Sequence, residues 1–245
     1  MPLVYAHRGG AALRPENTIA AFDHGLACGA DGLEFDVHLS RDGVVVIHHD
    51  ETLERTTSGH GRVADHTAAE LAALEVPALA DVLQRYPEIP LIVELKVDSP
   101  ELAHRVVDLL RAAGAVERTA LGSFFYRPLR AARAYEPSLR TGSSQEETRW
   151  ALYRSWVGWP LERPAFREFQ VPERSGLTKI VSPRFIDYAH KWQLPVKVWT
   201  VNDPDDMHRL VAWGVDALIT DRPDLAVPIA RQARRATGAS PGNPK

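Results

Sequence analysis

The sequence LEFDVHLSRDGVVVIHHD, residues 33–50, consists of two apolar runs joined by a short polar link. In an extended strand successive side chains point to opposite faces, so Glu34, Asp36 and His38 share one face and the apolar residues share the other. Such alternation ordinarily describes a strand with one face on the core and one face in solvent. Two carboxylates on one strand face therefore need support from other strands before they indicate a site.

The link SRDG between the two runs determines how the second run is placed. A crossover between parallel strands needs a dozen or more residues, and this link is far shorter. Its Asp42-Gly43 pair favours a hairpin turn instead. We therefore expect residues 44–48 to fold back antiparallel on an extended second strand, which returns His49 to about the level of Asp36.

Short apolar strands alternate with longer amphipathic stretches along the chain. Helices are expected at residues 18–28, 100–113 and 203–213, the first two with Asn17 and Ser99 as N-caps. Strands are expected at residues 3–7, 32–37, 91–95, 119–123, 139–142, 168–171, 195–201 and 217–220. This alternation predicts an α/β protein with a mostly parallel sheet. Eight such strands predict a (β/α)8 TIM barrel that is irregular at its second strand, where the antiparallel hairpin strand is added.

The 245 residues suit one domain, because TIM barrels often reach this length undivided. We assign residues 1–236 to a single barrel domain and expect residues 237–245 to form a disordered tail. The formal net charge of −3, without a long basic stripe, argues against nucleic acid as a partner. A single cysteine, Cys28, excludes an intrachain disulfide and a multi-cysteine metal site.

The N-terminal sequence MPLVYAHRGG lacks the basic and apolar regions of a signal peptide. The sequence has no run of about 18 apolar residues, so no membrane span is expected. Both features predict a cytoplasmic protein.

In a TIM barrel the active face lies at the C-terminal ends of the strands. Several predicted strands carry polar or aromatic residues at that end, namely His7 and Arg8, Glu34 and Asp36, Glu94 and Lys96, Trp199 and Asn202, and Asp221. Three carboxylates in one barrel mouth would repel one another and lose hydration, and a bound divalent cation relieves both problems. Glu34, Asp36 and Glu94 therefore predict a site for one cation. All-oxygen ligands suit Mg²⁺ or Ca²⁺, with Mn²⁺ as a further candidate.

The basic residues at the same end indicate an anionic ligand. Arg8 can bind a phosphate through two parallel hydrogen bonds, and Lys96 can add a point charge. His7 and His49 supply an acid/base pair that operates near neutral pH. Together with a cation, these residues predict a phosphate-binding active site for a small-molecule substrate.

Ordered motifs along residues 4–225 resemble those of the glycerophosphodiester phosphodiesterase family of TIM-barrel, phospholipase C-like phosphodiesterases. The motifs are AHRGG, RPENTIAAF, LEFDVHLSRDGVVVIHHDETLERTTSGHG, VPALADVL, IVELK, VWTVND and DALITDRPDL. The resemblance implies a hydrolase that cleaves glycerophosphodiesters to sn-glycerol 3-phosphate and an alcohol, in glycerol and lipid metabolism.

The motif positions also imply roles for individual residues. They match metal ligands at Glu34, Asp36 and Glu94, catalytic histidines at His7 and His49, and phosphate-binding groups at Arg8 and Lys96. Trp199 resembles a residue near the glycerol end, although a core position explains an aromatic residue there equally well. The motif HD selects His49 rather than its neighbour His48.

The expected chemistry uses His7 as general base and His49 as general acid, with positive groups that stabilise the charge of the transition state. The resemblance to related phosphodiesterases implies attack by the glycerol 2-hydroxyl, which gives a cyclic phosphate that water then opens. Direct attack by water is the alternative.

Three other functions fit parts of the sequence. A lysophospholipase D-type enzyme acting on lysophospholipids would need an apolar entrance, and Trp150, Trp156 and Trp159 would line one. A non-catalytic phosphodiester-binding protein would not need both His7 and His49. A metal-dependent sugar-phosphate isomerase on the same fold is disfavoured by the order of the motifs.

Overall fold

The computed structural model describes residues 2–161 and 164–236, so the tail expected at residues 237–245 lies outside the described residues. The strands are β1 (Leu3–His7), β2 (Gly32–Leu39), β3 (Val45–Ile47), β4 (Leu91–Leu95), β5 (Thr119–Gly122), β6 (Arg140–Thr141), β7 (Phe169–Pro172), β8 (Arg174–Ser175), β9 (Thr178–Lys179), β10 (Val196–Trp199) and β11 (Ala217–Thr220). The helices are α1 (Ile19–Ala27), the 3-10 helix η1 (Val63–Asp65), α2 (Ala68–Ala72), α3 (Leu79–Arg85), α4 (Pro100–Ala112), α5 (Tyr126–Tyr135), α6 (Gln145–Val157), α7 (Pro183–Lys191), α8 (Pro204–Ala212) and α9 (Pro223–Ala236).

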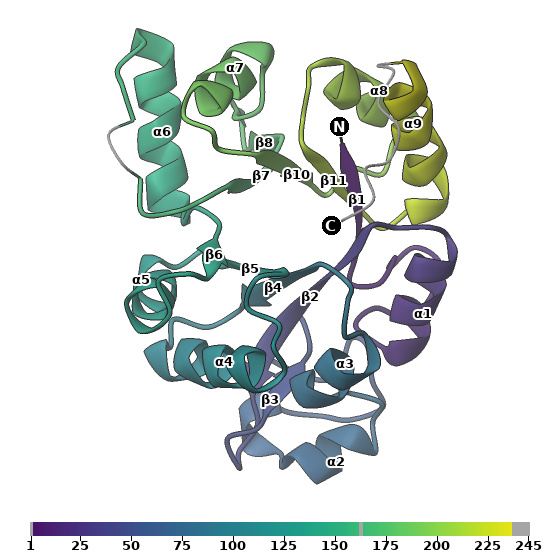
Figure 1. The fold of residues 1–245 in the computed structure, drawn as a ribbon. Coiled ribbons are helices and arrows are strands. Elements are labelled where there is room, and N and C mark those ends of the chain that lie inside the picture. The colour runs from purple at the N-terminus through teal and green to yellow at the C-terminus, as the bar shows by residue number, and fades with distance from the viewer. Residues whose placement is uncertain (1, 162–163, 237–245) are drawn as a thin grey trace.

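Parallel strands form the barrel in the order β6-β5-β4-β2-β1-β11-β10-β7. The two ends of this order meet through a parallel bridge between Gly142 and Glu168. The Arg167 N–H also donates to the Thr141 carbonyl across this seam at 2.9 Å. Helices surround the strands, as Figure 1 shows. The predicted TIM barrel is confirmed, and its seam between β6 and β7 has little regular strand pairing.

Strand β3 lies outside the barrel order and pairs antiparallel with β2. Val37 stands opposite Ile47, and Gly43 in the connecting turn has a φ of 75°, which glycine adopts without strain. The His48 N–H then donates to the Asp36 carbonyl at 3.0 Å. The predicted hairpin is confirmed, and it brings the chain that follows β3 back to the end of the barrel.

The chain between β3 and α3 forms a side lobe beyond the barrel wall, with α2 at its far end (Figure 1). This lobe has its own small apolar core, formed by Val46, Leu53, Val63, Leu71 and Val76. An antiparallel bridge between Thr52 and Arg62 closes the loop at its base. The lobe therefore holds the residues just after His49 in a fixed position.

The prediction that Asn17 caps helix α1 is wrong. Thr18 is the N-cap, and its Oγ1 accepts a hydrogen bond of 3.1 Å from the Ala21 N–H. Asn17 has a φ of 58°, in the left-handed region that asparagine tolerates, and its Nδ2 donates to Asp36 at 3.1 Å. The tertiary bond to Asp36 turns the Asn17 side chain inward, away from the helix end. The predicted cap at Ser99 is confirmed, since its Oγ accepts from the Leu102 N–H at 3.2 Å.

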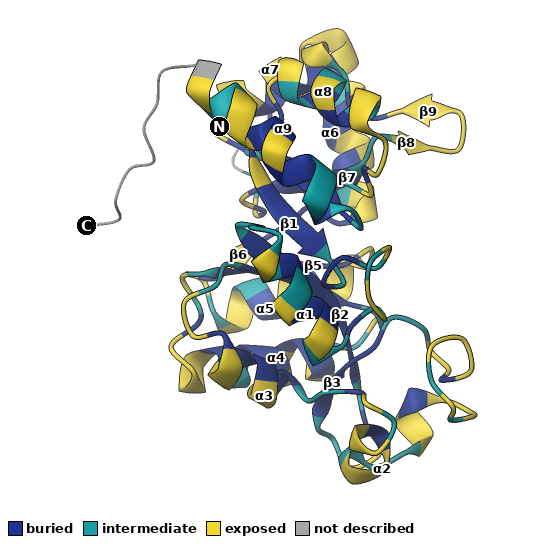
Figure 2. Ribbon diagram, turned by 90° about the vertical axis from the view of Figure 1, so that its right-hand side faces the viewer, coloured by how far each residue is buried: buried dark blue, intermediate teal, exposed yellow. Residues whose placement is uncertain are grey.

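Two apolar layers separate the barrel strands from the surrounding helices. One contains the ring contact between Phe22 and Phe35, whose centroids are 5.5 Å apart, and the other contains Phe169 and Phe185 at 5.0 Å. Figure 2 shows buried strands inside and exposed helix surfaces outside. No helix in the described part of the chain is both long and apolar enough to cross a membrane.

Removal of the Phe185 ring tests the packing of α7 against β7. Phe185 is 1% exposed, so Phe185→Ala leaves a cavity, and we expect it to lower the free energy of unfolding by about 3–5 kcal/mol. Phe185→Leu, the control, retains most of the volume and should cost less than about 1.5 kcal/mol. Urea denaturation followed by circular dichroism measures both. Equal losses in the two variants would contradict this packing.

Candidate active site

A cavity of about 290 Å³ lies where the barrel strands end. Seven of the eight predicted site residues line it, namely His7, Arg8, Glu34, His49, Glu94, Lys96 and Trp199. The eighth, Asp36, is 1% exposed, and its carboxylate lies within 4.8 Å of those of Glu34 and Glu94. The fold therefore brings together all eight residues from positions spread over most of the chain.

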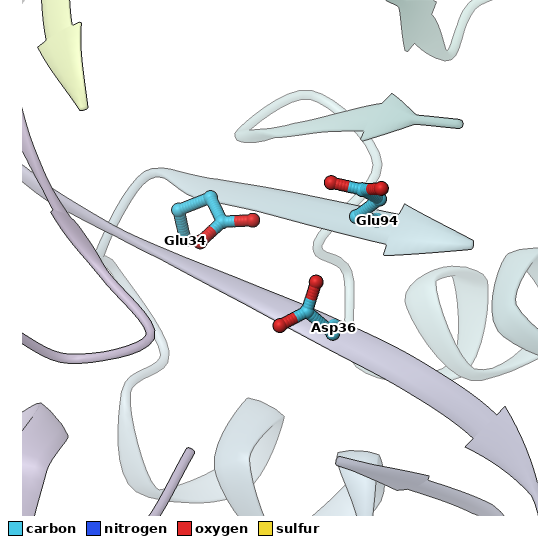
Figure 3. Close-up of side chains that lie close together, drawn as sticks. All are labelled: Glu34, Asp36 and Glu94. Atoms are coloured by element: carbon cyan, nitrogen blue, oxygen red, sulfur yellow. The ribbon is translucent and has the colours of Figure 1, made fainter. Parts of the chain in front are cut away.

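The carboxylates of Glu34, Asp36 and Glu94 form one compact cluster (Figure 3). Figure 3 shows them turned toward one another from β2 and β4, whose parallel register places Asp36 beside Glu94. Burial raises the pKa of Glu34 to about 8, an effect that His7 opposes and the other two carboxylates increase. Burial also raises the pKa of Glu94, while Lys96 counteracts it. Three acidic groups at this spacing, two of them buried, favour a bound cation that neutralises them.

The chemistry of the donor set fits a hard divalent cation. Glu34, Asp36 and Glu94 offer oxygen ligands, which Mg²⁺ and Ca²⁺ prefer. Beside them, the buried Asn17 Oδ1 has no hydrogen-bond partner among the described residues. Its amide Nδ2 is the group bonded to Asp36, so this free acceptor lies at the edge of the cluster.

Two basic side chains border the acidic cluster. Lys96 Nζ lies 3.4 Å from an Asp36 oxygen and 3.2 Å from a Glu94 oxygen. Burial lowers the pKa of Lys96, but the carboxylates of Glu94 and Asp36 outweigh burial and raise it. Arg8 Nε lies 3.3 Å from the other Asp36 oxygen, and its backbone N–H donates to Glu34 at 3.2 Å. Positive charge thus borders the same cavity wall as the carboxylates.

His7 is held between two carboxylates. Its Nδ1 lies 2.6 Å from Asp221 Oδ1, and Asn202 Nδ2 donates to the other Asp221 oxygen at 2.7 Å. Its Nε2 lies 3.8 Å from Glu34 Oε2, on the side of the cavity. Burial lowers the pKa of His7, but Glu34 and Asp221 outweigh burial and raise it. Asp221 therefore fixes the ring so that Nε2 is available to a ligand.

His49 has a carboxylate partner of its own. Its Nδ1 lies 2.6 Å from Asp50 Oδ1, and Arg55 Nε donates to Asp50 Oδ2 at 2.5 Å. Burial lowers the pKa of His49, against the opposing effects of Asp36 and Asp50. The neighbouring His48 is buried and faces elsewhere, with its Nε2 3.0 Å from the Thr52 carbonyl. His49 is therefore the histidine of this pair that lines the cavity.

An ionic chain connects the His49 side of the cavity to the Arg8 side. Arg55 donates to both Glu16 oxygens, at 2.7 and 3.0 Å, and Arg8 Nη1 lies 3.0 Å from Glu16 Oε1. Arg55 therefore connects Asp50 to Glu16, and Glu16 orients Arg8. The loop that follows β3 contributes Asp50 and Arg55 to this chain, so the hairpin organises more of the site than His49 alone.

The sequence-based prediction placed Asn202 and Asp221 at the barrel mouth without pairing either with His7, and it gave Asp50 no role. Asp50 directly follows His49, and its presence in the sequence HHD was the available signal. Asp221 lies 214 residues from His7, so sequence spacing gave no such signal. Arg222, next to it, pairs instead with Asp224 at 2.8 Å.

A second buried polar group forms part of the cavity floor. Gln170 lines the cavity, and its Nε2 donates at 2.7 Å to Glu168, which also pairs with Lys197 at 2.7 Å. A Cβ atom at Gly122 would lie 2.5 Å from the Gln170 side-chain oxygen, so the amide rests directly on that glycine. The sequence signal for this buried polar group was the presence of charged residues, Glu168 and Lys197, in two predicted strands. The bond from Nε2 to Glu168 therefore determines the orientation of the Gln170 amide, whose oxygen lies against Gly122.

Trp199 forms an aromatic wall of the cavity together with Phe124. Their ring centroids lie 5.7 Å apart in an edge-to-face arrangement, and Lys96 Nζ lies 5.9 Å from the Phe124 centroid. Trp199 also packs on the apolar group that contains Tyr5 and Ile219. It therefore has both a packing contact and a cavity-facing position.

Comparisons with known proteins agree with this arrangement. The model of the glycerophosphoryl diester phosphodiesterase family matches residues 7–225. A glycerophosphodiester phosphodiesterase of Caldanaerobacter subterraneus subsp. tengcongensis is 30% identical, over 94% of this chain and 98% of the relative. One of Bacillus altitudinis is 28% identical, over 96% of this chain and 100% of the relative. The crystal structure of the Agrobacterium tumefaciens enzyme superposes with a TM-score of 0.75 at 28% identity, covering 93% of this chain and all of that one. With a family match over most of its length, the chain belongs to the glycerophosphoryl diester phosphodiesterase family.

Proposed function

We propose that the protein hydrolyses glycerophosphodiesters to sn-glycerol 3-phosphate and an alcohol, with a divalent cation and the acid/base pair His7 and His49. One observation carries the proposal beyond family membership. Three carboxylates, of which Glu34 and Asp36 are buried, lie within 4.8 Å of one another, and the histidines beside them each have a carboxylate on Nδ1 at 2.6 Å. A protein that only binds phosphodiesters does not need two oriented imidazoles.

Glu34, Asp36 and Glu94 are the proposed ligands of one Mg²⁺ or Ca²⁺ ion, with Mn²⁺ as a further candidate. When bound, such an ion supplies Lewis-acid stabilisation of the charge on a phosphoryl oxygen. Lys96 and Arg8 add positive charge from the same wall of the cavity. Arg8 keeps guanidinium N–H groups beyond its contacts with Glu16 and Asp36, so it can also donate to a phosphate.

We assign His7 as general base and His49 as general acid. Asp221 and Asp50 hold the two Nδ1 atoms, which leaves each Nε2 free to exchange a proton with the substrate. The raised pKa of His7 favours its protonated form, and Glu34 is a main cause. Neutral His7, which a base requires, is therefore favoured when a cation neutralises the charge of Glu34. The opposite assignment, with His7 as acid, is the competing one.

Removal of a proposed metal ligand should abolish catalysis. Asp36→Asn removes one negative oxygen, so we expect the kcat to fall by roughly 10²-fold or more and the bound metal to be lost. Glycerol 3-phosphate release and elemental analysis of the dialysed protein measure these effects. The control is Glu51→Gln, an exposed carboxylate paired with Arg62, which should retain metal and activity. Full activity in chelated, metal-free protein would contradict the proposal.

A change of leaving group should reveal which histidine is the acid. On a substrate with an aliphatic alcohol, His7→Ala and His49→Ala should each lose roughly 10²–10⁴-fold in kcat. A nitrophenol leaving group needs little protonation, so His49→Ala should recover much of its rate on glycerophospho-p-nitrophenol, whereas His7→Ala should not. His60→Ala, at an exposed loop position, is the control. Recovery by His7→Ala instead would reverse the assignment.

The identity of the nucleophile is tested with a substrate that lacks the glycerol 2-hydroxyl. If this hydroxyl attacks, the deoxy substrate should bind with similar affinity but show almost no turnover. A tethered nucleophile gains many powers of ten in effective concentration, and this advantage would be lost. Phosphorus NMR of the reaction with the natural substrate should show a transient cyclic phosphate. Comparable turnover of the two substrates would leave water as the nucleophile.

A further inference from the structure

Large apolar side chains are exposed mainly in one sector of the described surface. Besides Tyr135, nine of the twelve exposed large hydrophobic residues found there lie between residues 124 and 177. They are Phe124, Phe125, Tyr126, Trp150, Tyr153, Trp156, Val157, Trp159 and Leu177. Monomeric proteins rarely expose so concentrated an apolar group without using it. We call these nine residues the aromatic rim.

The aromatic rim borders the mouth of the active-site cavity. It consists of the loop before α5, the outer side of α6, and the tip of the β8–β9 hairpin. Phe124 and Tyr153 line the cavity, and the Gln145 N–H donates to the Phe124 carbonyl at 3.1 Å, which joins the first two segments. The hairpin protrudes from the body of the protein, as Figure 2 shows, and Leu177 in its turn is 100% exposed.

Helix α6 differs from an ordinary barrel helix. Its inner side buries Ala151 and Leu152 against the barrel, together with the small polar residues Thr148 and Ser155. Its outer side carries Trp150 and Tyr153, three residues apart on one face, with ring centroids 6.4 Å apart. Tyr153 also contacts the ring of Trp156 at 5.3 Å. The outer face of a surface helix is normally polar, yet here it carries aromatic rings, and Trp150 is 66% exposed.

Basic side chains accompany the aromatic rim. Arg149 and Arg154 lie on α6, and Arg174 and Lys179 lie on the hairpin. None of these four has a carboxylate within 4.0 Å among the described residues; all the salt bridges there involve other groups. The carboxylates of the same segments are mostly engaged, since Glu147 pairs with Arg133, Glu168 with Lys197 and Glu173 with Arg209. The sector is therefore locally positive in a chain of net charge −3.

We propose that the aromatic rim and its four cations are a docking surface for an anionic lipid bilayer. Tryptophan and tyrosine favour the boundary between headgroups and acyl chains, because each combines an apolar ring with a polar N–H or O–H. Arginine and lysine beside them attract anionic headgroups. The exposed Leu177 inserts at the protruding tip, and the rings of α6 lie along the interface.

A second copy of this chain fits the aromatic rim less well. In a two-fold dimer built on this surface, each copy would bring its four cations against those of the other. Such like charges repel, whereas an anionic bilayer neutralises them. Charge complementarity therefore selects the lipid surface as the occupant.

Docking in this way places the cavity mouth at the membrane. This placement rests on the proposed function in one respect, because that proposal identifies the cavity as the active site. A phosphodiester that keeps an acyl chain in the bilayer, such as a lysophospholipid, would then reach Phe124 and Tyr153 without crossing bulk water.

Vesicle co-sedimentation of the full chain tests the proposal without any turnover. The protein should sediment with vesicles that contain phosphatidylglycerol, much less with pure phosphatidylcholine, and salt should release it. The double variant Trp150→Ala/Leu177→Asp should lower the bound fraction by roughly tenfold or more, and Arg174→Glu should remove the preference for phosphatidylglycerol. Trp192→Ala, at an exposed tryptophan outside the rim, is the matched control and should bind like the parent.

Hydrolysis of soluble glycerophosphocholine separates this proposal from the proposed function. The double variant changes residues that do not line the cavity, so it should retain the parental rate. Absence of hydrolysis by the parent protein would refute the proposed function. Vesicle binding would still test the docking surface in that case. Equal sedimentation of the parent and the double variant, or no binding by either, would overturn the docking surface. A parental dimer in analytical ultracentrifugation that the double variant abolishes would assign the rim to contact between copies and overturn it too.

Discussion

The placement of three carboxylates, two of them buried and one half-buried, within 4.8 Å of one another is the constraint on which the site depends. Like charges removed from water at this spacing are unfavourable unless positive groups surround them. Lys96 and Arg8 both lie within 3.4 Å of Asp36, which is the most buried of the three acids. The same electrostatics that make the cluster costly suit it to a divalent ion and a phosphate, so the acidic group and its neighbours form a single functional unit.

Different parts of the fold position the two histidines beside these carboxylates. His7 ends β1 and depends on Asp221 at the end of β11, the neighbouring strand in the barrel. His49 comes from the antiparallel excursion outside the barrel, and depends on Asp50 and the side lobe. One imidazole is thus positioned by the barrel and the other by an addition to it. The addition gives the second histidine a carboxylate partner without altering the parallel strands.

Local patterns were sufficient to predict most of the fold. Strand alternation placed Glu34 and Asp36 on one face, and the short link before Gly43 required an antiparallel return. The errors arose where tertiary contacts override local preference. Asn17 resembles a helix cap in sequence, but its bond to Asp36 gives the cap to Thr18. The contact between His7 and Asp221 depends on barrel closure, which no local pattern encodes.

The glycine beneath Gln170 has a consequence for how the cavity changes during evolution. Gly122 belongs to the barrel wall, yet any side chain added there would collide with the Gln170 amide. Gly142, at the seam, is similarly close, with a Cβ position 3.0 Å from Gln170 Cδ. A substitution at either glycine would therefore displace the amide, which lines the cavity, and alter the shape of that cavity. Gly122 itself lines the cavity, so the space within the active site depends on positions that carry no side chain.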